Sequence, residues 1–173
     1  YDGKILPAFY HSTCSGSTEN ASVLWNIDLA PLKGVVCGFC KDSPHFSWKA
    51  TVSKEKIRQL WEKQGQRIKK VKEVVIAGRD KSGRAINLDI VTDEKDIEVA
   101  AKDFRNLIGP DIIKSTNFKI SASNGDLIFD GLGWGHGVGL CQWGAYFMAK
   151  SGSDYLKILE YYYPGSTLAK LSK

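Results

Sequence analysis

The stretch Gly131-Leu-Gly-Trp-Gly-His-Gly-Val-Gly139 places a glycine at every second position. Glycine loses more backbone entropy on folding than any other residue, so this run indicates a need for positive φ angles or close backbone approach. It lacks the Gly-Lys-Ser/Thr of a P-loop and the spacing of a dinucleotide fingerprint. It presents Trp134 and His136 on a tightly bent backbone, and an aromatic face beside an imidazole suits a sugar ring. The alternative is a packing loop around a satisfied histidine.

A second candidate motif, Tyr10-His-Ser-Thr-Cys14, lies near the other end of the chain. It places His11 beside two hydroxyls and a thiol, from which a Ser/His or Cys/His nucleophile can be assembled. No third member stands at a recognisable spacing. The alternative is that the hydroxyls of Ser12 and Thr13 bond their own loop backbone.

The four cysteines form the most diagnostic chemical pattern in the chain. In Cys37-Gly-Phe-Cys40 two thiolates are separated by two residues, which is a spacing that can hold one tetrahedral Zn(II). We predict a structural zinc site formed with Cys14 and Cys141, and His45 is the substitute ligand. Two disulfides, or free or redox-active thiols, are the alternatives. A thioredoxin-type redox pair is disfavoured because Asp42-Ser-Pro44 blocks the helix that such a pair opens.

Hydrophobic periodicity and turn residues predict a single α+β domain over residues 1–173, with short antiparallel strands in hairpins and packed helices. We expect strands over 5–10, 71–77, 86–90, 118–120 and 127–129, and helices over 54–63, 99–108, 141–150 and from about 153 to 162. Ser53 and Ser153 are the expected helix N-caps. Turn chemistry at 80–83 and at Asn124-Gly125 closes two hairpins. The region 25–48 is expected to be irregular.

Composition sets the outer limits. The 173 residues are 43% hydrophobic and 25% charged, which is typical of a folded domain and excludes wholesale disorder and fibrous architectures. The net charge of +5 leaves nucleic acid, a membrane surface and a cell-wall polymer open as anionic partners. No apolar run is long enough to cross a bilayer, and no signal peptide is visible. Because the chain begins with Tyr1 rather than Met, we expect it to be a piece of a longer protein.

Four blocks of sequence carry a family resemblance, in matching order and across almost the whole chain. They are Ala8-Phe-Tyr-His-Ser-Thr13 with Gly16 and Thr18-Glu19-Asn20; Ser43-Pro-His-Phe-Ser-Trp48; Phe104-Arg105 with Leu107 and Gly109; and Gly133 through Ala145 leading to Tyr161-Tyr-Tyr-Pro-Gly165. With these blocks the chain resembles the stage II sporulation protein D (SpoIID) family of cell-wall lytic transglycosylases. The last block is the most specific of the four.

The resemblance implies a function. Such domains cut peptidoglycan glycan strands between N-acetylmuramic acid and N-acetylglucosamine, favour strands stripped of stem peptides, and leave a 1,6-anhydro end. A single glutamate protonates the leaving oxygen and then helps the sugar's own 6-hydroxyl attack. The expected partners are glycan strands, other cell-wall hydrolases and the N-terminal part of the same protein, with no nucleic acid. The expected location is extracytoplasmic, with membrane anchoring through a missing N-terminal segment.

One departure from the family pattern concerns the catalytic acid. The family's glutamate lies on an upstream helix that nothing in residues 1–173 matches, so we expect this chain to be the C-terminal, substrate-groove portion of the domain. Glu19 is a binding or loop-organising residue first and a candidate acid second. The residues expected to line one cleft are His11, Ser12, Glu19, Trp134, His136 and Gln142. A non-catalytic peptidoglycan-binding or scaffolding module and a Zn-dependent cell-wall hydrolase, such as an amidase, are the alternatives.

Overall fold

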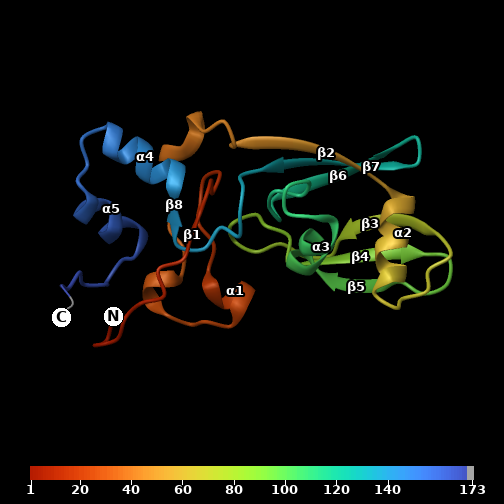
Figure 1. The fold of residues 1–173 in the computed structure, drawn as a ribbon, viewed down its shortest axis with the longest axis horizontal. Coiled ribbons are helices and arrows are strands. Elements are labelled where there is room, and N and C mark those ends of the chain that lie inside the picture. The colour runs from red at the N-terminus through yellow and green to blue at the C-terminus, as the bar shows by residue number, and fades with distance from the viewer. Residues whose placement is uncertain (171–173) are drawn as a thin grey trace. The chain divides into compact units, whose positions relative to one another are not determined.

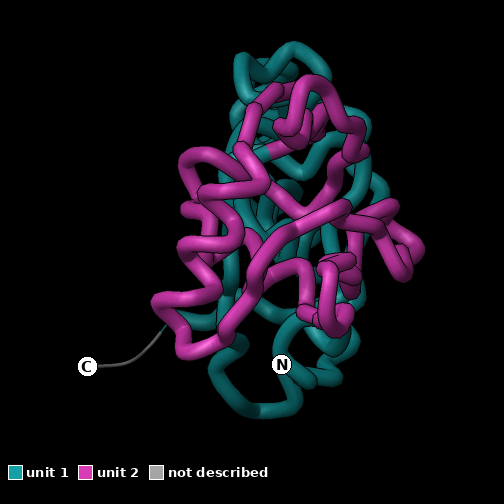
Figure 2. Tube along the Cα trace, turned by 90° about the vertical axis from the view of Figure 1, so that its right-hand side faces the viewer, with its two compact units in different colours: residues 1–46, 134–173 teal, residues 47–133 magenta. Residues whose placement is uncertain are grey.

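The computed structural model describes residues 1–170, in which short helices stand beside small β-sheets (Figure 1). The α+β class is therefore confirmed. Within it, the chain forms two compact units (Figure 2). Unit 1 comprises residues 1–46 and 134–173, and unit 2 comprises residues 47–133. In the described part of the chain, no helix has the length and apolar character needed to cross a bilayer.

Unit 1 is assembled from the two ends of the sequence. Strand β1 (Tyr10–His11) pairs in parallel with β8 (Leu140–Cys141), so His11 stands opposite Cys141. The other elements of unit 1 are α1 (Ala21–Trp25), the 3-10 turns η1 (Ala30–Leu32) and η2 (Phe39–Asp42), α4 (Gln142–Lys150) and α5 (Tyr155–Tyr162). Their buried apolar side chains form one cluster, which includes Leu32, Val138, Met148, Ile158 and Tyr162.

Three expectations for unit 1 are corrected. The strand expected over 5–10 is limited to β1, because Pro7 has no N–H to donate to a ladder. Helix α5 is capped by Asp154, whose carboxylate accepts a hydrogen bond from the Lys157 N–H at 2.9 Å, and not by Ser153. Helix α1 was not predicted, and it ends at Trp25, where the region expected to be irregular begins.

Unit 2 contains two three-stranded antiparallel sheets, with strand orders β2-β7-β6 and β3-β4-β5. The strands are β2 (Ser47–Ser53), β3 (Val71–Ile76), β4 (Asn87–Thr92), β5 (Ile97–Ala100), β6 (Phe118–Ser123) and β7 (Asp126–Leu132). Two helices, α2 (Lys54–Lys63) and α3 (Ala101–Ile108), complete the unit. The apolar core joins Ile57 and Trp61 of α2 to Phe104 of α3 and Phe129 of β7.

The local signals in unit 2 are largely confirmed. The Ser53 hydroxyl accepts a hydrogen bond from the Lys56 N–H at 3.1 Å and caps α2. Asn124 and Gly125 have φ of 50° and 88° and form the tight turn between β6 and β7. Two strands were missed, β2 and β5. Helix α3 begins at Ala101 rather than at Val99, because the preceding residues pair with β4.

Candidate functional site: a four-cysteine cluster and a histidine pair

The four cysteines converge in unit 1 although they come from separate segments. Cys14 follows β1, Cys37 and Cys40 flank the start of η2, and Cys141 ends β8. All four are buried, and their Sγ atoms lie within 4.8 Å of one another. The Sγ atoms of Cys14 and Cys40 are 3.5 Å apart. The four side chains thus form one cluster of free thiols rather than two separate pairs.

This cluster fits a tetrahedral metal ion. Zinc–sulfur bonds of about 2.3 Å place the four sulfurs of a tetrathiolate site about 3.8 Å apart. The spread of the Sγ atoms, up to 4.8 Å, is close to that value. Because all four thiols are almost completely excluded from solvent, the cluster offers a closed site with four protein ligands and no open position for a catalytic water.

Neighbouring donors suit thiolate ligands. The backbone N–H groups of Cys14 and Gly144 each donate to the Cys141 sulfur at 3.3 Å. The hydroxyl of Tyr162 lies 3.1 Å from the Cys37 sulfur. Burial, and then this hydrogen bond, raise the pKa of Tyr162, so the phenol keeps its proton and is the donor. Such donors around the first ligand layer orient thiolates and spread their charge.

The thiols also perturb one another. Hydrogen bonds with Cys141, Cys37 and Cys40, together with burial, raise the pKa of Cys14. The hydrogen bond from Cys14 is the main cause that lowers the pKa of Cys37 to about 7 and also lowers the pKa of Cys40. For Cys141, the hydrogen bond with Cys14 lowers the pKa, but those with Cys37 and Cys40, together with burial, raise it overall. Cys37 and Cys40 are therefore the thiols that ionise first, and the thiolate is the form that binds metals.

His45, the substitute ligand of the sequence-based prediction, does not belong to the cluster. Its ring packs edge-on against Trp134, with ring centroids 4.7 Å apart, and approaches Trp143 at 6.2 Å. The group of side chains close enough to hold a metal among the described residues consists of the four cysteines alone.

A pair of histidines forms the second part of the site. His11 ends β1, and His136 lies in the glycine-rich loop, with ring centroids 5.7 Å apart. The loop reaches this position because its glycines adopt positive φ, and a Cβ on Gly139 would lie only 2.0 Å from the Phe9 carbonyl oxygen. The predicted need for close backbone approach is confirmed at this position.

The backbone of Val138 sets the tautomers of both rings. The Val138 carbonyl accepts a hydrogen bond from Nδ1 of His11 at 3.1 Å, so His11 carries a proton on Nδ1. The Val138 N–H donates to Nδ1 of His136 at 3.1 Å, so a neutral His136 carries its proton on Nε2. His136 is half-buried, whereas Nε2 of His11 is shielded from solvent, so His136 is the more accessible ring of the pair.

Glu19 organises this part of unit 1. It is 2% exposed, and its backbone N–H donates to the Gly137 carbonyl at 2.9 Å. Its carboxylate accepts a hydrogen bond from the Asn20 N–H at 2.6 Å, beside the start of α1. The backbone bond connects the N-terminal polar loop to the glycine-rich loop, and the carboxylate bond orders the N-terminal segment itself.

Two aromatic residues beside His136 were missed by the sequence-based analysis. The Trp25 ring lies 4.9 Å from the His136 ring, and the Phe9 ring lies 4.6 Å from the Trp25 ring. Trp25 is 38% exposed, so its indole presents an apolar surface next to the imidazole. The one sequence signal for Trp25 is its large apolar side chain at the edge of a polar stretch.

The other expected cleft residues lie in different surroundings. Ser12 and Thr13 form a hydroxyl chain that continues to Ser43 in a separate segment, whereas the alternative expected these hydroxyls to bond their own loop backbone. Trp134 packs on His45, and the exposed Gln142 opens α4. The described contacts therefore group His11, Glu19 and His136, and a common cleft for all six residues stays a prediction.

A run of ring contacts continues from Trp134 onto α4. Trp143, Tyr146 and Phe147 have ring centroids between 5.1 and 5.8 Å apart. Tyr146 is 53% exposed. These residues follow the motif directly, and their i, i+3, i+4 spacing is the signal that could have placed them on one helix face.

Comparisons with known proteins place the whole chain in a family. A family described as "Domain of unknown function (DUF8618)" matches residues 32–139. The chain is 33% identical over 165 residues to an "Uncharacterized protein" of Brachyspira hyodysenteriae, covering 95% of this chain and 44% of the relative. It is 30% identical over 175 residues to the "Stage II sporulation protein D" of Bacillus amyloliquefaciens, covering 98% and 47%. It is 24% identical over 216 residues to the "Amidase enhancer" of Bacillus subtilis, covering 97% and 30%.

The chain belongs to the DUF8618 family and is a SpoIID-like protein. It spans less than half the length of each of these relatives.

Proposed function

We propose that this chain is the glycan-binding portion of a peptidoglycan lytic transglycosylase. The observation that carries the proposal is the histidine pair, in which the backbone of Val138 sets the tautomers of His11 and His136. The partly exposed indole of Trp25 lies beside the His136 ring. A sugar ring needs such a combination, because its C–H face packs on an aromatic ring while its hydroxyls require directed hydrogen bonds. SpoIID-like family membership supports the choice of a cell-wall glycan.

The histidines have different roles in this proposal. The half-buried His136 ring contacts a hydroxyl or N-acetyl oxygen of the glycan, and the Trp25 indole packs on the sugar's apolar face. His11 is a positioning residue, since it is buried beside His136 and bonded to Val138. Glu19 keeps the two loops together.

The general acid is proposed to lie in a part of the protein outside residues 1–173. Cleavage requires a proton at the leaving oxygen in the transition state, which a positioned carboxylic acid supplies. Glu19 is a poor candidate because it is 2% exposed and already accepts a hydrogen bond from Asn20. The chain covers 44% and 47% of these two relatives, which leaves room for such a segment in the longer protein.

We further propose that Cys14, Cys37, Cys40 and Cys141 hold one structural Zn(II). A bound zinc supplies a cross-link between the N-terminal loop, η2 and the start of α4. The closed geometry disfavours the alternative of a Zn-dependent hydrolase, which needs an open ligand position. An extracytoplasmic location, anchored through another segment, follows from the proposed substrate.

A non-catalytic role is the second candidate. One relative is named "Amidase enhancer", which favours a module that binds glycan and assists another cell-wall hydrolase. Both candidates require glycan binding in unit 1, and they differ in whether the longer protein cleaves the strand.

The proposal is tested by measuring binding of the chain to glycan strands stripped of their stem peptides. We expect His136→Ala to weaken binding about tenfold while the melting temperature changes little, because the ring is half-buried at the surface. Tyr155→Ala is a control, since it removes a ring of α5 that is 64% exposed and is not one of the expected cleft residues. Equal binding by the wild-type chain and His136→Ala would refute the assigned site.

A further inference from the structure

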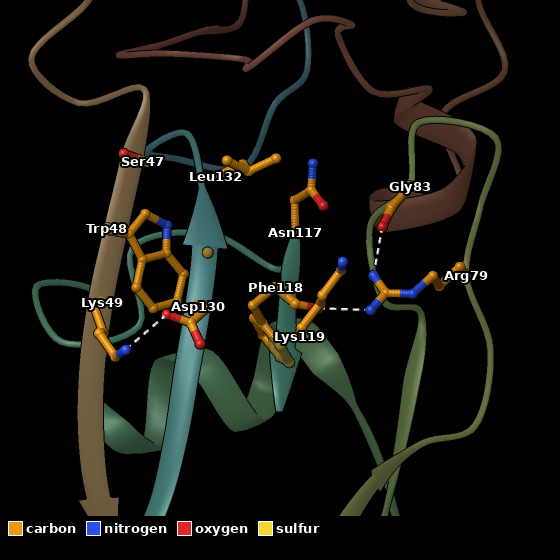
Figure 3. Close-up of a pocket in the computed structure, with 11 residues that line it drawn as sticks. Ser47, Trp48, Lys49, Arg79, Gly83, Asn117, Phe118, Lys119, Asp130 and Leu132 are labelled. Carbon is orange, nitrogen blue, oxygen red and sulfur yellow. Dashed lines mark hydrogen bonds and ion pairs between the residues drawn. The ribbon is translucent and has the colours of Figure 1, made fainter. Parts of the chain in front are cut away.

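A solvent-facing trough lies on the β2-β7-β6 sheet of unit 2 (Figure 3). Its volume is about 690 Å³. The lining residues come from the three strands, from the residue that precedes β6 and from the connection between β3 and β4: Ser47, Trp48, Lys49, Arg79, Gly83, Asn117, Phe118, Lys119, Asp130, Gly131 and Leu132. None of these residues belongs to the site in unit 1.

The strand register explains the shape of the trough. Trp48, Gly131 and Phe118 stand opposite one another across the three strands. All three are buried, so their row contributes a floor without projecting side chains. A Cβ on Gly131 would lie 2.1 Å from the Trp48 ring, which shows that the indole packs under this row on the core side.

The walls are the rows on either side of this floor. Lys49, Asp130 and Lys119 form one row, because Asp130 pairs with both lysines in the register. Ser47 and Leu132 form the other row, and Asn117 adjoins it through its carbonyl, which accepts a hydrogen bond from the Leu132 N–H at 2.8 Å. Residues two apart in a strand are separated by about 7 Å, which is wide enough for one pyranose ring edge-on.

Arg79 closes one end of the trough in a fixed position. Its guanidinium donates from Nη1 to the Gly83 carbonyl and from Nη2 to the Phe118 carbonyl, each at 2.6 Å (Figure 3). The Phe118 carbonyl lies between Asn117 and Lys119 in the chain, so the guanidinium is held beside both side chains. A planar guanidinium oriented in this way loses little entropy on binding a carboxylate.

The charges favour an anionic ligand. The trough contains the cations Lys49, Arg79 and Lys119 and one acid, Asp130. Asp130 pairs with Lys49 at 3.3 Å, and within the described residues Lys119 makes no ion pair. The exposed Leu132 and the Asn117 amide add an apolar contact and a hydrogen-bonding group, which are the complements of a sugar ring and its substituents.

We propose that this trough binds a carboxylate-bearing sugar, with Arg79 and Lys119 on the carboxylate and Leu132 and Asn117 on the ring. Resting on the proposed function, the ligand is the N-acetylmuramic acid unit of a glycan strand whose lactyl carboxylate is free because its stem peptide has been removed. Unit 2 therefore binds strands without stem peptides in preference to strands that carry them. A strand with stem peptides has an amide in place of this carboxylate and loses the contact.

A second, basic hollow in unit 2 does not match this ligand. It is lined by Lys54, Glu55, Arg58, Lys69, Lys70, Val71, Lys72 and Gly125. Two of its cations are neutralised, since Arg58 bonds both Glu55 and Glu62 and Lys69 pairs with Glu94 at 2.7 Å. Its remaining charges form a solvated lysine surface without a fixed guanidinium.

The experiment is an NMR titration of the full chain with N-acetylmuramic acid, its lactyl methyl ester and N-acetylglucosamine. We expect the free acid to shift the backbone amides of Asn117, Lys119 and Gly131, and the ester and N-acetylglucosamine to shift them several-fold less. Lys119→Gln should weaken binding of the acid about threefold to fivefold, which is the contribution of one partly exposed charge. Lys63→Gln is the matched control, because Lys63 is an exposed lysine of α2 outside the trough.

Equal shifts from acid and ester, or an unchanged affinity in Lys119→Gln, would overturn the inference. This outcome is separable from failure of the proposed function. Glycan binding that depends on His136 with no shifts in the trough rejects the trough alone. Trough shifts together with His136-independent glycan binding reject the site in unit 1 alone.

Discussion

At the scale of single residues, backbone groups and glycines decide how the site is built. Val138 uses its carbonyl and its N–H on two different histidines and thereby assigns a proton to a different ring nitrogen in each. The side chains His11, His136 and Glu19 could be selected from sequence because loop histidines among glycines are unusual. The role of Val138 could not be predicted from sequence, because its backbone carbonyl contacts His11 across more than a hundred residues, and any residue type supplies such a carbonyl.

Gly144 carries a prediction at this scale. Alanine inside a helix is normally more stable than glycine by roughly 0.5–1 kcal/mol. In α4, however, a Cβ at this position would lie 2.0 Å from the Tyr162 hydroxyl and 2.9 Å from the Cys37 sulfur. We expect Gly144→Ala to lower the free energy of unfolding by about 1–3 kcal/mol through overpacking.

Urea unfolding of Gly144→Ala and of the control Gly38→Ala measures this difference. Gly38 has φ of −82°, and a Cβ there meets nothing within 4 Å, so its substitution should be nearly neutral. A Gly144→Ala variant as stable as the wild type would show that Tyr162 does not occupy the place described.

At the scale of elements, sequence patterns predicted helices and strands correctly where the pattern extends over many residues. They failed where the pattern is short or weak. The amphipathic helix α2 with its Ser53 cap and the β6–β7 hairpin were predicted correctly. The strand β2 was missed although Trp48 and Val52 alternate with exposed residues, because the small Ala50 between them weakens the pattern. The β1–β8 pairing joins opposite ends of the sequence, and no local signal predicts such a contact.

The capping of α5 gives a prediction at this scale. Asp154→Ala should lower the free energy of unfolding by about 1 kcal/mol, because the Lys157 N–H loses its acceptor at the helix start. Ser153→Ala, one residue earlier, should lower the free energy of unfolding by only a few tenths of the change expected for Asp154→Ala. Thermal unfolding of the two variants side by side measures the contrast, and a larger effect at Ser153 would restore the cap expected from sequence.

At the scale of the whole molecule, the chain combines two units with different means of stabilisation. Unit 2 has an aromatic and aliphatic core of its own. The buried cluster of unit 1 instead contains the four cysteines and few long aliphatic side chains. Two short 3-10 helices, η1 and η2, belong to the same unit. The convergence of these thiols was predicted from the Cys37–Cys40 spacing, whereas the division into two units was not.

Metal removal should therefore affect the units unequally. We expect elemental analysis to find about one zinc per chain, and we expect a chelator to increase hydrogen exchange in residues 1–46 and 134–170. Exchange in residues 47–133 should change little, because none of the four ligands lies there. A zinc content near zero together with two intact disulfides would contradict the zinc proposal.

The most direct test of the central claim is the analysis of products from stem-peptide-free glycan strands by mass spectrometry. The strands are incubated with this chain, with its Glu19→Gln variant and with a longer protein that includes the preceding segment. We predict 1,6-anhydro ends with the longer protein and only binding with residues 1–173, because loss of a general acid slows such a step by about 10²–10⁴-fold. Turnover by residues 1–173 that is abolished in Glu19→Gln would contradict this account and assign the acid to Glu19, and turnover that survives Glu19→Gln but is lost with a chelator would indicate a metal hydrolase.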